Sequence, residues 1–191
     1  AEVAEVSVPM HTYTIPLWNC VAIEGGLDSF THGHQAYQTK GYFNPKLQSA
    51  MMRGLKTHAH DLSPTAKLGM LVAHYMRTRY DGVFYARAQN FSRALTAAYD
   101  AVLDTADLVV MPTTPQTAHK RPALPEEDRA EHISQALNMC WNTAAFDLTG
   151  HPSISVPVHG VDGLPVGLML TGRHFEDATV LRAAHAYEQS A

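Results

Sequence analysis

Apolar residues recur at helical spacing in several segments of this chain. A stripe of residues spaced three or four apart runs from Phe84 to Val102 and predicts one long helix of about five turns. A second stripe, from Ile133 to Ala144, stops near Gly150, as expected of a helix that ends at a glycine. Shorter helices are predicted over residues 10–24 and directly after the pairs Asn44-Pro45 and Ser63-Pro64.

Other segments have the pattern of strands. Polar and apolar residues alternate from Val3 to Val8, a period of two that predicts a strand. Asp107–Pro112 is a short apolar run, typical of a buried strand. The proline-rich segment that follows it is predicted to be a surface loop.

The last third of the chain predicts a hairpin followed by a helix. Ser153–Val158 and Pro165–Gly172 are expected to pair, with a turn around Asp162-Gly163. We expect the connection from His159 to Leu164 to be too long for a two-residue turn. Glu176 and Asp177 suit a helix N-terminus. The residues expected to share one face of this helix are Leu181, Ala184 and Tyr187.

The order of these elements, in which strands are mixed with covering helices, places the chain in the α/β class. More specifically, we expect part of a mixed β-sheet covered by helices. The strands at Val3–Val8 and 108–111 need neighbours, because unpaired strand backbone is unfavourable. The chain also enters its first strand without a lead-in, so we expect residues 1–191 to continue a longer domain.

Composition narrows the classes of function. The chain has 46% hydrophobic and 17% charged residues, a net charge of −4 and a pI near 6.3. This balance does not favour nucleic acid or an anionic membrane as a partner, and no apolar run approaches the length of a membrane span. The two cysteines, Cys20 and Cys140, cannot form a disulfide framework, so we expect a cytoplasmic protein.

No serine of the chain has the sequence context of a nucleophile. None is flanked by glycine, and the Gly-x-Ser-x-Gly motif is absent. Ser153 and Ser155 alternate with apolar residues, so both hydroxyls are expected on one face of a strand and to be satisfied by hydrogen bonds. We therefore predict no catalytic residue in this chain.

The histidines raise the alternative of a metal site. The pairs His32-x-His34 and His58-x-His60 have a spacing that suits two ligands on a strand, but both fall where loop or helix is expected. No carboxylate or cysteine stands at a matching third position. Surface histidines are the preferred interpretation, and we predict neither a metal nor a cofactor.

Three segments, taken in order, resemble one family. Residues 147–188, DLTGHPSISVPVHGVDGLPVGLMLTGRHFEDATVLRAAHAYE, resemble the C-terminal end of the amidase signature family. Residues 84–118, FYARAQNFSRALTAAYDAVLDTADLVVMPTTPQTA, are similar to the segment that lies upstream of it. Residues 3–25, VAEVSVPMHTYTIPLWNCVAIEG, complete the order, so the resemblance spans nearly the whole chain.

Members of that family hydrolyse amides with a serine nucleophile, a second serine in a cis peptide and a lysine base, on a mixed sheet wrapped by helices. The resemblance implies this fold and this activity. The Gly/Ser-rich motif that carries the serines is absent here, and no lysine stands in the family's context. Residues 1–191 are therefore expected to be the C-terminal portion of an amidase signature domain. The catalytic triad would lie on an N-terminal portion, either covalently linked or a separate chain.

The resemblance also suggests substrate contacts. Glutamine-using amidotransferase subunits of this family hold the free amino acid with an arginine in the long helix and an aspartate before the GxP motif. These positions fall on Ser92 and Cys140, so both charges are absent. Cys140 and Leu137, expected on one helix face, would instead form an apolar wall. Trp18 would add a flat aromatic side, and Thr143 completes the expected contacts.

The preferred function is hydrolysis of carboxamides to carboxylic acid and ammonia, with an aliphatic or aromatic acyl group. The chain alone is expected to be inactive; its partners are the N-terminal portion and a small-molecule amide, and assembly into a homo-oligomer is left open. Two alternatives also stay open. One is an amidotransferase glutaminase, which Arg93 would favour if the alignment shifted by one residue. The other is a non-enzymatic binding domain with the same fold.

Overall fold

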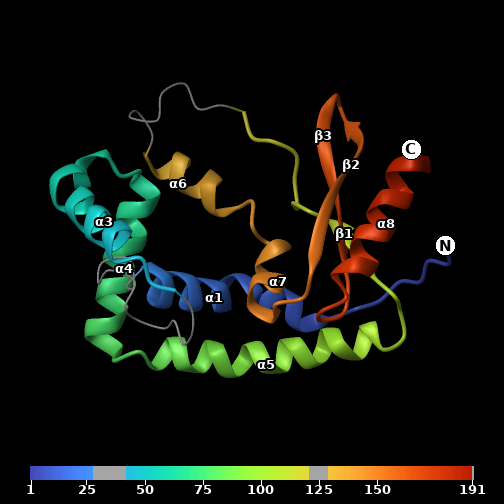
Figure 1. Ribbon diagram of the computed structural model, residues 1–191, viewed down its shortest axis with the longest axis horizontal. Helices are drawn as coiled ribbons and strands as arrows, with labels where there is room; N and C mark the ends of the chain where they lie inside the picture. The colour runs from blue at the N-terminus through green and yellow to red at the C-terminus, as the bar shows by residue number, and fades with distance from the viewer. Residues whose placement is uncertain (28–41, 121–128, 191) are drawn as a thin grey trace. The chain divides into compact units, whose positions relative to one another are not determined.

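The computed structural model of the chain describes residues 1–27, 42–120 and 129–190 (Figure 1). The chain divides into two compact units. Unit 1 comprises residues 1–18, 90–121 and 137–191, and unit 2 comprises residues 19–89 and 122–136. The helix predicted over 84–102 is confirmed as α5 (Val83–Leu103), which contributes residues to both units. No helix in the described ranges is long and apolar enough to cross a membrane.

Unit 1 is built on a three-stranded antiparallel sheet. Its strands β1 (Val109–Pro112), β2 (Ser153–Val161) and β3 (Leu164–Thr171) lie in the order β1-β3-β2, so β3 is central. The prediction of strands covered by helices is confirmed, and β1 has its expected neighbour. The described residues contain no parallel pair, so the mixed character expected of the sheet is not found within them.

The hairpin turn is tighter than predicted. β2 and β3 are joined by the two residues Asp162-Gly163, whose φ angles are +51° and +76°. Left-handed backbone at both positions matches the twist of a hairpin, and glycine adopts it without strain. The expected longer loop is wrong because β2 continues past a bulge between Val158 and Val161. At Gly160 in this bulge, a Cβ would lie 2.9 Å from a backbone carbonyl carbon of β3, so no side chain fits.

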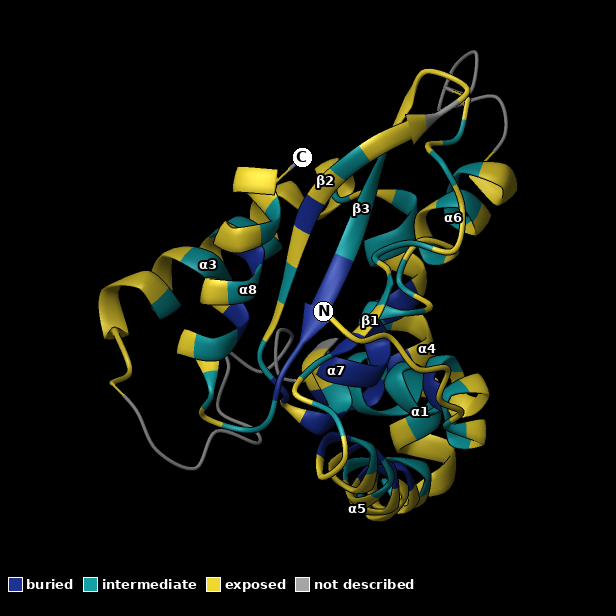
Figure 2. Ribbon diagram, turned by 90° about the vertical axis from the view of Figure 1, so that its right-hand side faces the viewer, coloured by how far each residue is buried: buried dark blue, intermediate teal, exposed yellow. Residues whose placement is uncertain are grey.

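Helices cover both faces of the sheet in unit 1 (Figure 2). Met169 and Leu170 are neighbours on β3 and face opposite sides, as alternation along a strand requires. Met169 joins a core with α5 and α7 (Thr143–Thr149), whose buried members are Leu95, Tyr99, Leu103, Val109, Ala145, Phe146 and Met169. Leu170 joins a smaller core against α8 (Asp177–Ser190), with Val156, Val180 and Ala184.

The C-terminal helix α8 begins where the sequence predicts it. Asp177 is its first residue, and the carboxylate of Glu176 pairs with Arg173 at 3.5 Å. Ala184 is buried as expected, but Leu181 is exposed and Val180 takes its place against the sheet. The predicted face is therefore confirmed at Ala184 and Tyr187 and wrong at Leu181.

The N-terminal segment is not a strand. Residues 1–7 are exposed, the side chain of Val3 to 92%, and the first element is the 3-10 helix η1 (Pro9–Tyr13). The strand predicted at Val3–Val8 is wrong, because alternation sets which side chains share a face but does not supply a neighbouring backbone. Residues 10–24 are helical as predicted, in successive 3-10, α and π segments: η1, α1 (Thr14–Trp18) and η2 (Asn19–Leu27).

The helix predicted from Ile133 to Ala144 is broken. α6 (Arg129–Leu137) ends before α7 starts at Thr143. In the connection, the Asn142 amide Nδ2 donates to the Pro112 carbonyl at 2.7 Å and so ties this segment to the end of β1. The prediction that Leu137 and Cys140 share one helix face is therefore wrong. The predicted stop at Gly150 is confirmed by its φ of +76°.

The described residues of unit 2 are helical and capped as the sequence predicts. The side chain of Asn44 accepts hydrogen bonds from the N–H groups of Lys46 and Leu47, at 3.1 and 3.2 Å. Ser63 Oγ accepts from Ala66 N–H at 3.2 Å. Each cap precedes a proline in the first turn, which explains where these helices begin. The elements are η2, α3 (Pro45–His58), η3 (Ala59–Asp61), α4 (Pro64–Tyr80), the first part of α5 and nearly all of α6.

A buried carboxylate holds the start of α5 within unit 2. Glu24 is only 2% exposed, and its Oε2 accepts the N–H of Tyr85 at 3.2 Å. A negative charge at a helix N-terminus is stabilised by the unpaired N–H groups there. Gly25 allows this approach, because a Cβ would lie 2.6 Å from the Tyr85 ring.

Candidate functional site

A pocket of about 340 Å³ lies in unit 1 beside the sheet and α7. Its lining combines hydroxyl groups with apolar side chains and one carboxylate, and includes no lysine or arginine. This size and mixture suit a small molecule that is held by shape and a few polar groups. The lining residues are Thr113, Thr143, Phe146, Asp147, His151, Ser153, Ile154, Ser155 and Met169.

One side of the pocket is a pair of hydroxyls held over a glycine. Thr113 Oγ1 and Ser155 Oγ are 2.6 Å apart, and the Thr113 N–H donates to the Gly167 carbonyl at 2.8 Å. A Cβ at Gly167 would stand 2.7 Å from Thr113 Oγ1 and would also meet Ser155 Oγ. The hydroxyl pair therefore depends on the missing side chain of Gly167.

The strand serines are satisfied by other hydroxyls. Ser153 Oγ lies 2.8 Å from Thr171 Oγ1, just as Ser155 Oγ pairs with Thr113. The prediction of hydrogen-bonded serines on one strand face is confirmed. Neither of these bonds involves a lysine or an imidazole, the groups that would activate a serine as a nucleophile.

Of the predicted substrate contacts, Thr143 lines this pocket and Trp18 bonds to a residue that lines it. Thr143 is part of the lining, and its Oγ1 donates to the Cys140 carbonyl at 3.3 Å. The Trp18 indole Nε1 donates to Asp147 Oδ2 at 3.0 Å, and Asp147 is itself a lining residue. Trp18 therefore does not line the pocket itself but orients the Asp147 carboxylate that does.

The other three predicted contacts, Ser92, Leu137 and Cys140, do not line the pocket either, and the bonds of the Ser92 carbonyl and the Cys140 thiol go to residues outside the lining. Ser92 is 6% exposed within α5, and its carbonyl accepts the Thr96 hydroxyl at 2.8 Å. Cys140 lies between α6 and α7 and its Sγ donates to the Leu137 carbonyl at 3.5 Å. Burial raises the pKa of the Cys140 thiol, and the nearby Asp147 adds to this, so the thiol is neutral near pH 7. Substrate contact by these three residues stays a prediction.

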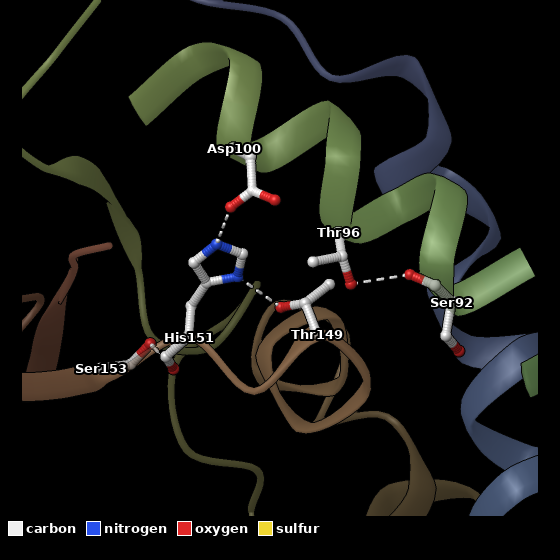
Figure 3. A network of polar contacts seen from close by, with 6 residues as sticks. All are labelled: Ser92, Thr96, Asp100, Thr149, His151 and Ser153. Atoms are coloured by element: carbon white, nitrogen blue, oxygen red, sulfur yellow. Dashed lines mark hydrogen bonds and ion pairs between the residues drawn. The ribbon is translucent and has the colours of Figure 1, made fainter. Parts of the chain in front are cut away.

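One lining residue of the pocket, His151, is a buried imidazole in a network of polar contacts (Figure 3). His151 follows the left-handed Gly150, and its side chain is fully buried. Its Nε2 lies 3.2 Å from Asp100 Oδ1, and its Nδ1 lies 2.8 Å from Thr149 Oγ1. Burial lowers the pKa of His151 and His174 adds to this, while the Asp100 carboxylate opposes it. The ring is thus neutral near pH 7.

The sequence does not predict this network, because its members are far apart in the chain. Asp100 and His151 come from different elements, 51 residues apart. A partial signal exists in α5, where Ser92, Thr96 and Asp100 recur every four residues and form a polar row on one side of the helix (Figure 3). Such a row inside an otherwise apolar stripe indicates a buried polar partner.

The histidine pairs considered from sequence do not form a metal site in the described residues. His32-x-His34 lies outside those residues. His58 and His60 are exposed, with ring centroids 6.3 Å apart, and His60 Nε2 is 3.2 Å from its neighbour Asp61. Their interpretation as surface histidines is confirmed.

The chain matches the Amidase family model over residues 1–181. It is 44% identical over 174 residues to the uncharacterized protein in the nthA 5′ region of Rhodococcus erythropolis, covering 91% of this chain and 87% of that protein. It is 39% identical over 187 residues to the enantioselective amidase of Rhodococcus rhodochrous, covering 97% of this chain and 36% of that enzyme. A solved crystal structure of an amidase is similar with a TM-score of 0.66 at 21% identity, covering 100% of this chain and 38% of that one.

The chain thus spans little more than a third of the enantioselective amidase and of the solved amidase. The structural likeness, at 21% identity, establishes a shared fold for that part. The family match covers most of the chain. The chain belongs to the amidase signature family.

Proposed function

We propose that this chain is the C-terminal portion of an amidase that hydrolyses carboxamides to a carboxylic acid and ammonia. It supplies one wall of the substrate pocket. A segment outside residues 1–191, linked or separate, supplies the serine nucleophile, the cis-peptide serine and the lysine base of the family. The observation that supports this is the pocket of unit 1, whose lining offers hydroxyls and apolar atoms but no strand serine paired with a base.

Amide hydrolysis needs a nucleophile, a base and donors for the developing oxyanion. The strand hydroxyls of the pocket are bonded to threonines, and so are not activated. The lysines of the described residues do not line the pocket: Lys46, Lys56 and Lys67 belong to unit 2, and Lys120 is absent from the lining. A lysine base would therefore come from the rest of the enzyme.

The wall selects the acyl group. Phe146, Ile154 and Met169 offer apolar surface, and burying apolar substrate carbons contributes roughly 25 cal/mol per Å². Asp147, held by Trp18, would repel a substrate carboxylate. We therefore favour neutral amides with aliphatic or aromatic acyl groups over amides of acidic compounds.

The glutaminase alternative receives less support. Free glutamine carries a carboxylate and an ammonium group, and both need counter-charges when they are desolvated. Ser92 is buried within α5, and the next residue, Arg93, is exposed with Nη1 donating to Asn90 Oδ1 at 3.5 Å. No arginine lines the pocket, so the carboxylate of glutamine would lack a partner there.

A chimera tests the proposal. This chain would replace the matching 36% of the Rhodococcus rhodochrous enantioselective amidase, and ammonia release would be measured with aliphatic and aromatic amides. We expect a monodisperse chimera that hydrolyses amides, whereas the 191-residue chain by itself does not. A folded chimera without activity would contradict the proposal and favour a non-enzymatic binding domain. The intact host enzyme is the control for the assay.

A further inference from the structure

Three metal-ligating side chains meet in unit 1, in a group that we term the His-Asp cluster. Asp100 comes from α5, His151 follows α7, and His174 lies in the connection between β3 and α8. Their ligand atoms all lie within 4.8 Å of one another, and no other group of three or more potential ligands occurs in residues 1–27, 42–120 and 129–190.

We propose that the His-Asp cluster binds a divalent transition-metal ion of the zinc type. Two imidazoles and one carboxylate are a ligand set that Zn²⁺ and its neighbours in the first transition series accept. The single negative charge of Asp100 compensates part of the charge of a divalent ion. His151 also lines the pocket, but no step of the hydrolysis proposed there depends on the ion.

The distances agree with such a site. Zinc binds histidine nitrogen and carboxylate oxygen at about 2.0–2.2 Å, so two ligands at a tetrahedral angle are separated by about 3.4 Å. His151 Nε2 and Asp100 Oδ1 are 3.2 Å apart, which fits one edge of that tetrahedron. The rings of His151 and His174 have centroids 4.1 Å apart with an angle of 31° between their planes. Two imidazoles on one tetrahedral ion have ring centroids about 5 Å apart, so the partly exposed His174 has to turn away from His151 to complete the set.

The surroundings hold the central ligand in place. Thr149 Oγ1 lies 2.8 Å from His151 Nδ1, so Nδ1–H can donate to it while Nε2 faces the ion. Metal-bound histidines usually have such a partner on the second nitrogen, which fixes the orientation of the ring. The rings of Tyr99 and Phe146 pack against the His151 ring and exclude water from that side of the cluster.

Solvent can reach the cluster from one direction. The His151 side chain is fully buried, but that of Asp100 is 50% exposed. An ion could enter past Asp100, and water would take the remaining coordination position, as in other sites with three protein ligands. The bound ion would join α5, the end of α7 and the start of the α8 connection. It would therefore stabilise unit 1.

Hydrogen bonding by itself explains only part of the arrangement. The bonds of His151 account for Asp100 and Thr149. They do not involve His174, whose ring lies 4.1 Å from that of His151, centroid to centroid, with the two planes tilted by 31°. This difference makes His174 the residue that separates the two explanations.

The test is a metal titration of the 191-residue chain, with any chain that copurifies, after treatment with a chelator. Zn²⁺ binding is measured by calorimetry, and Co²⁺ is used as a probe whose visible absorption reports coordination by nitrogen. We expect one equivalent bound and a higher melting temperature with metal. His174→Ala leaves the bonds of His151 in place and should weaken binding at least tenfold. Asp100→Asn, which can still bond to His151, should also weaken it.

The matched control is the double variant His58→Ala with His60→Ala, which removes the exposed histidine pair of unit 2. This variant should keep the wild-type affinity and the Co²⁺ spectrum. Circular dichroism without metal checks that every variant is folded. The proposal is overturned if the folded wild type binds no equivalent of Zn²⁺ or Co²⁺. It is equally overturned if folded His174→Ala binds as well as the wild type, or if only the control loses the ion.

Discussion

Two polar regions of unit 1 differ in their chemical groups and in their surroundings. On the pocket side, Thr113 and Ser155 share a hydrogen bond over the backbone of Gly167, next to open space. Behind it, His151 connects Asp100 to Thr149 with its own side chain fully buried. The first region is uncharged, and its geometry depends on the absence of a side chain at Gly167. The second contains ionisable groups, and its geometry depends on the large side chain of His151.

The difference indicates separate roles. Uncharged hydroxyls beside a small cavity can position a substrate at little cost, since water replaces their bonds when they are lost. A buried imidazole has no such replacement, so its bonds hold the fold together. The comparison predicts that substitutions in the buried region cause the largest losses of stability. Substitutions at the pocket should cause smaller losses of stability and should change substrate selectivity.

The largest effect is expected at the centre of the buried region. His151→Ala removes a fully buried ring and leaves Thr149 and Asp100 without it, which should lower the free energy of unfolding by about 2–4 kcal/mol. Urea unfolding in the presence of a chelator measures this without any contribution from metal. A loss below 0.5 kcal/mol, on the scale of surface substitutions, would show that the network is not structural.

The next effect tests the pocket side. Gly167→Ala places a methyl group against Thr113 and Ser155, and should cost about 1–3 kcal/mol. Because the conflict is local, the cost should shrink in a Ser155→Ala background, where one of the two oxygens is removed. A double-mutant cycle measures this coupling. Additive costs would mean that the hydroxyl pair does not depend on Gly167.

A smaller effect is expected in the pH dependence of stability, at Tyr99, whose ring packs against His151. Burial raises the pKa of Tyr99 to about 12, and its hydroxyl bonds His11 Nδ1 at 2.6 Å. The folded chain then holds this proton more tightly than the unfolded chain, so stability is intact below pH 10 and falls as pH rises toward 12. Tyr99→Phe should cost about 1 kcal/mol at pH 7 and flatten the fall between pH 10 and 12. Unchanged pH dependence in this variant would contradict the assignment.

The smallest effects are expected for the strand serines. Ser153→Ala and Ser155→Ala each break one hydroxyl bond at the sheet face, and should cost about 0.5–1 kcal/mol in unfolding experiments. In the chimera, each should change kcat less than tenfold. Removal of a true serine nucleophile lowers kcat by orders of magnitude more, on the order of a millionfold. A loss of that size would mean that one of these serines is catalytic.

Local sequence patterns predicted the elements that are stabilised locally. The helix starts after Asn44 and Ser63 follow from side-chain caps within three residues, and the stop at Gly150 follows from its left-handed backbone. The strand at Val3–Val8 and the continuous helix from Ile133 to Ala144 were wrong. The first has no partner strand among the described residues, and the second ends at Leu137 and begins again at Thr143.

The candidate site was predictable to a similar extent. The hydrogen-bonded serine face was predicted because it belongs to one strand with a clear pattern, whereas substrate contact by Thr143, which lines the pocket, stays a prediction. Asp100 and His151 were not predicted, because nothing local relates residues 51 positions apart. The resemblance to the family supplied the general location, and packing between elements determined which side chains meet.

The most direct test of the account is the acyl selectivity of the chimera when Thr143 is enlarged. Thr143→Leu should fill part of the pocket, so the ratio of kcat/KM for an aromatic amide to that for a short aliphatic amide should change at least fivefold, about 1 kcal/mol. The control is Thr105→Leu, at an exposed position near the end of α5, which should leave the ratio unchanged. A folded Thr143→Leu chimera with the same ratio as its parent would contradict the claim that this chain forms the acyl wall.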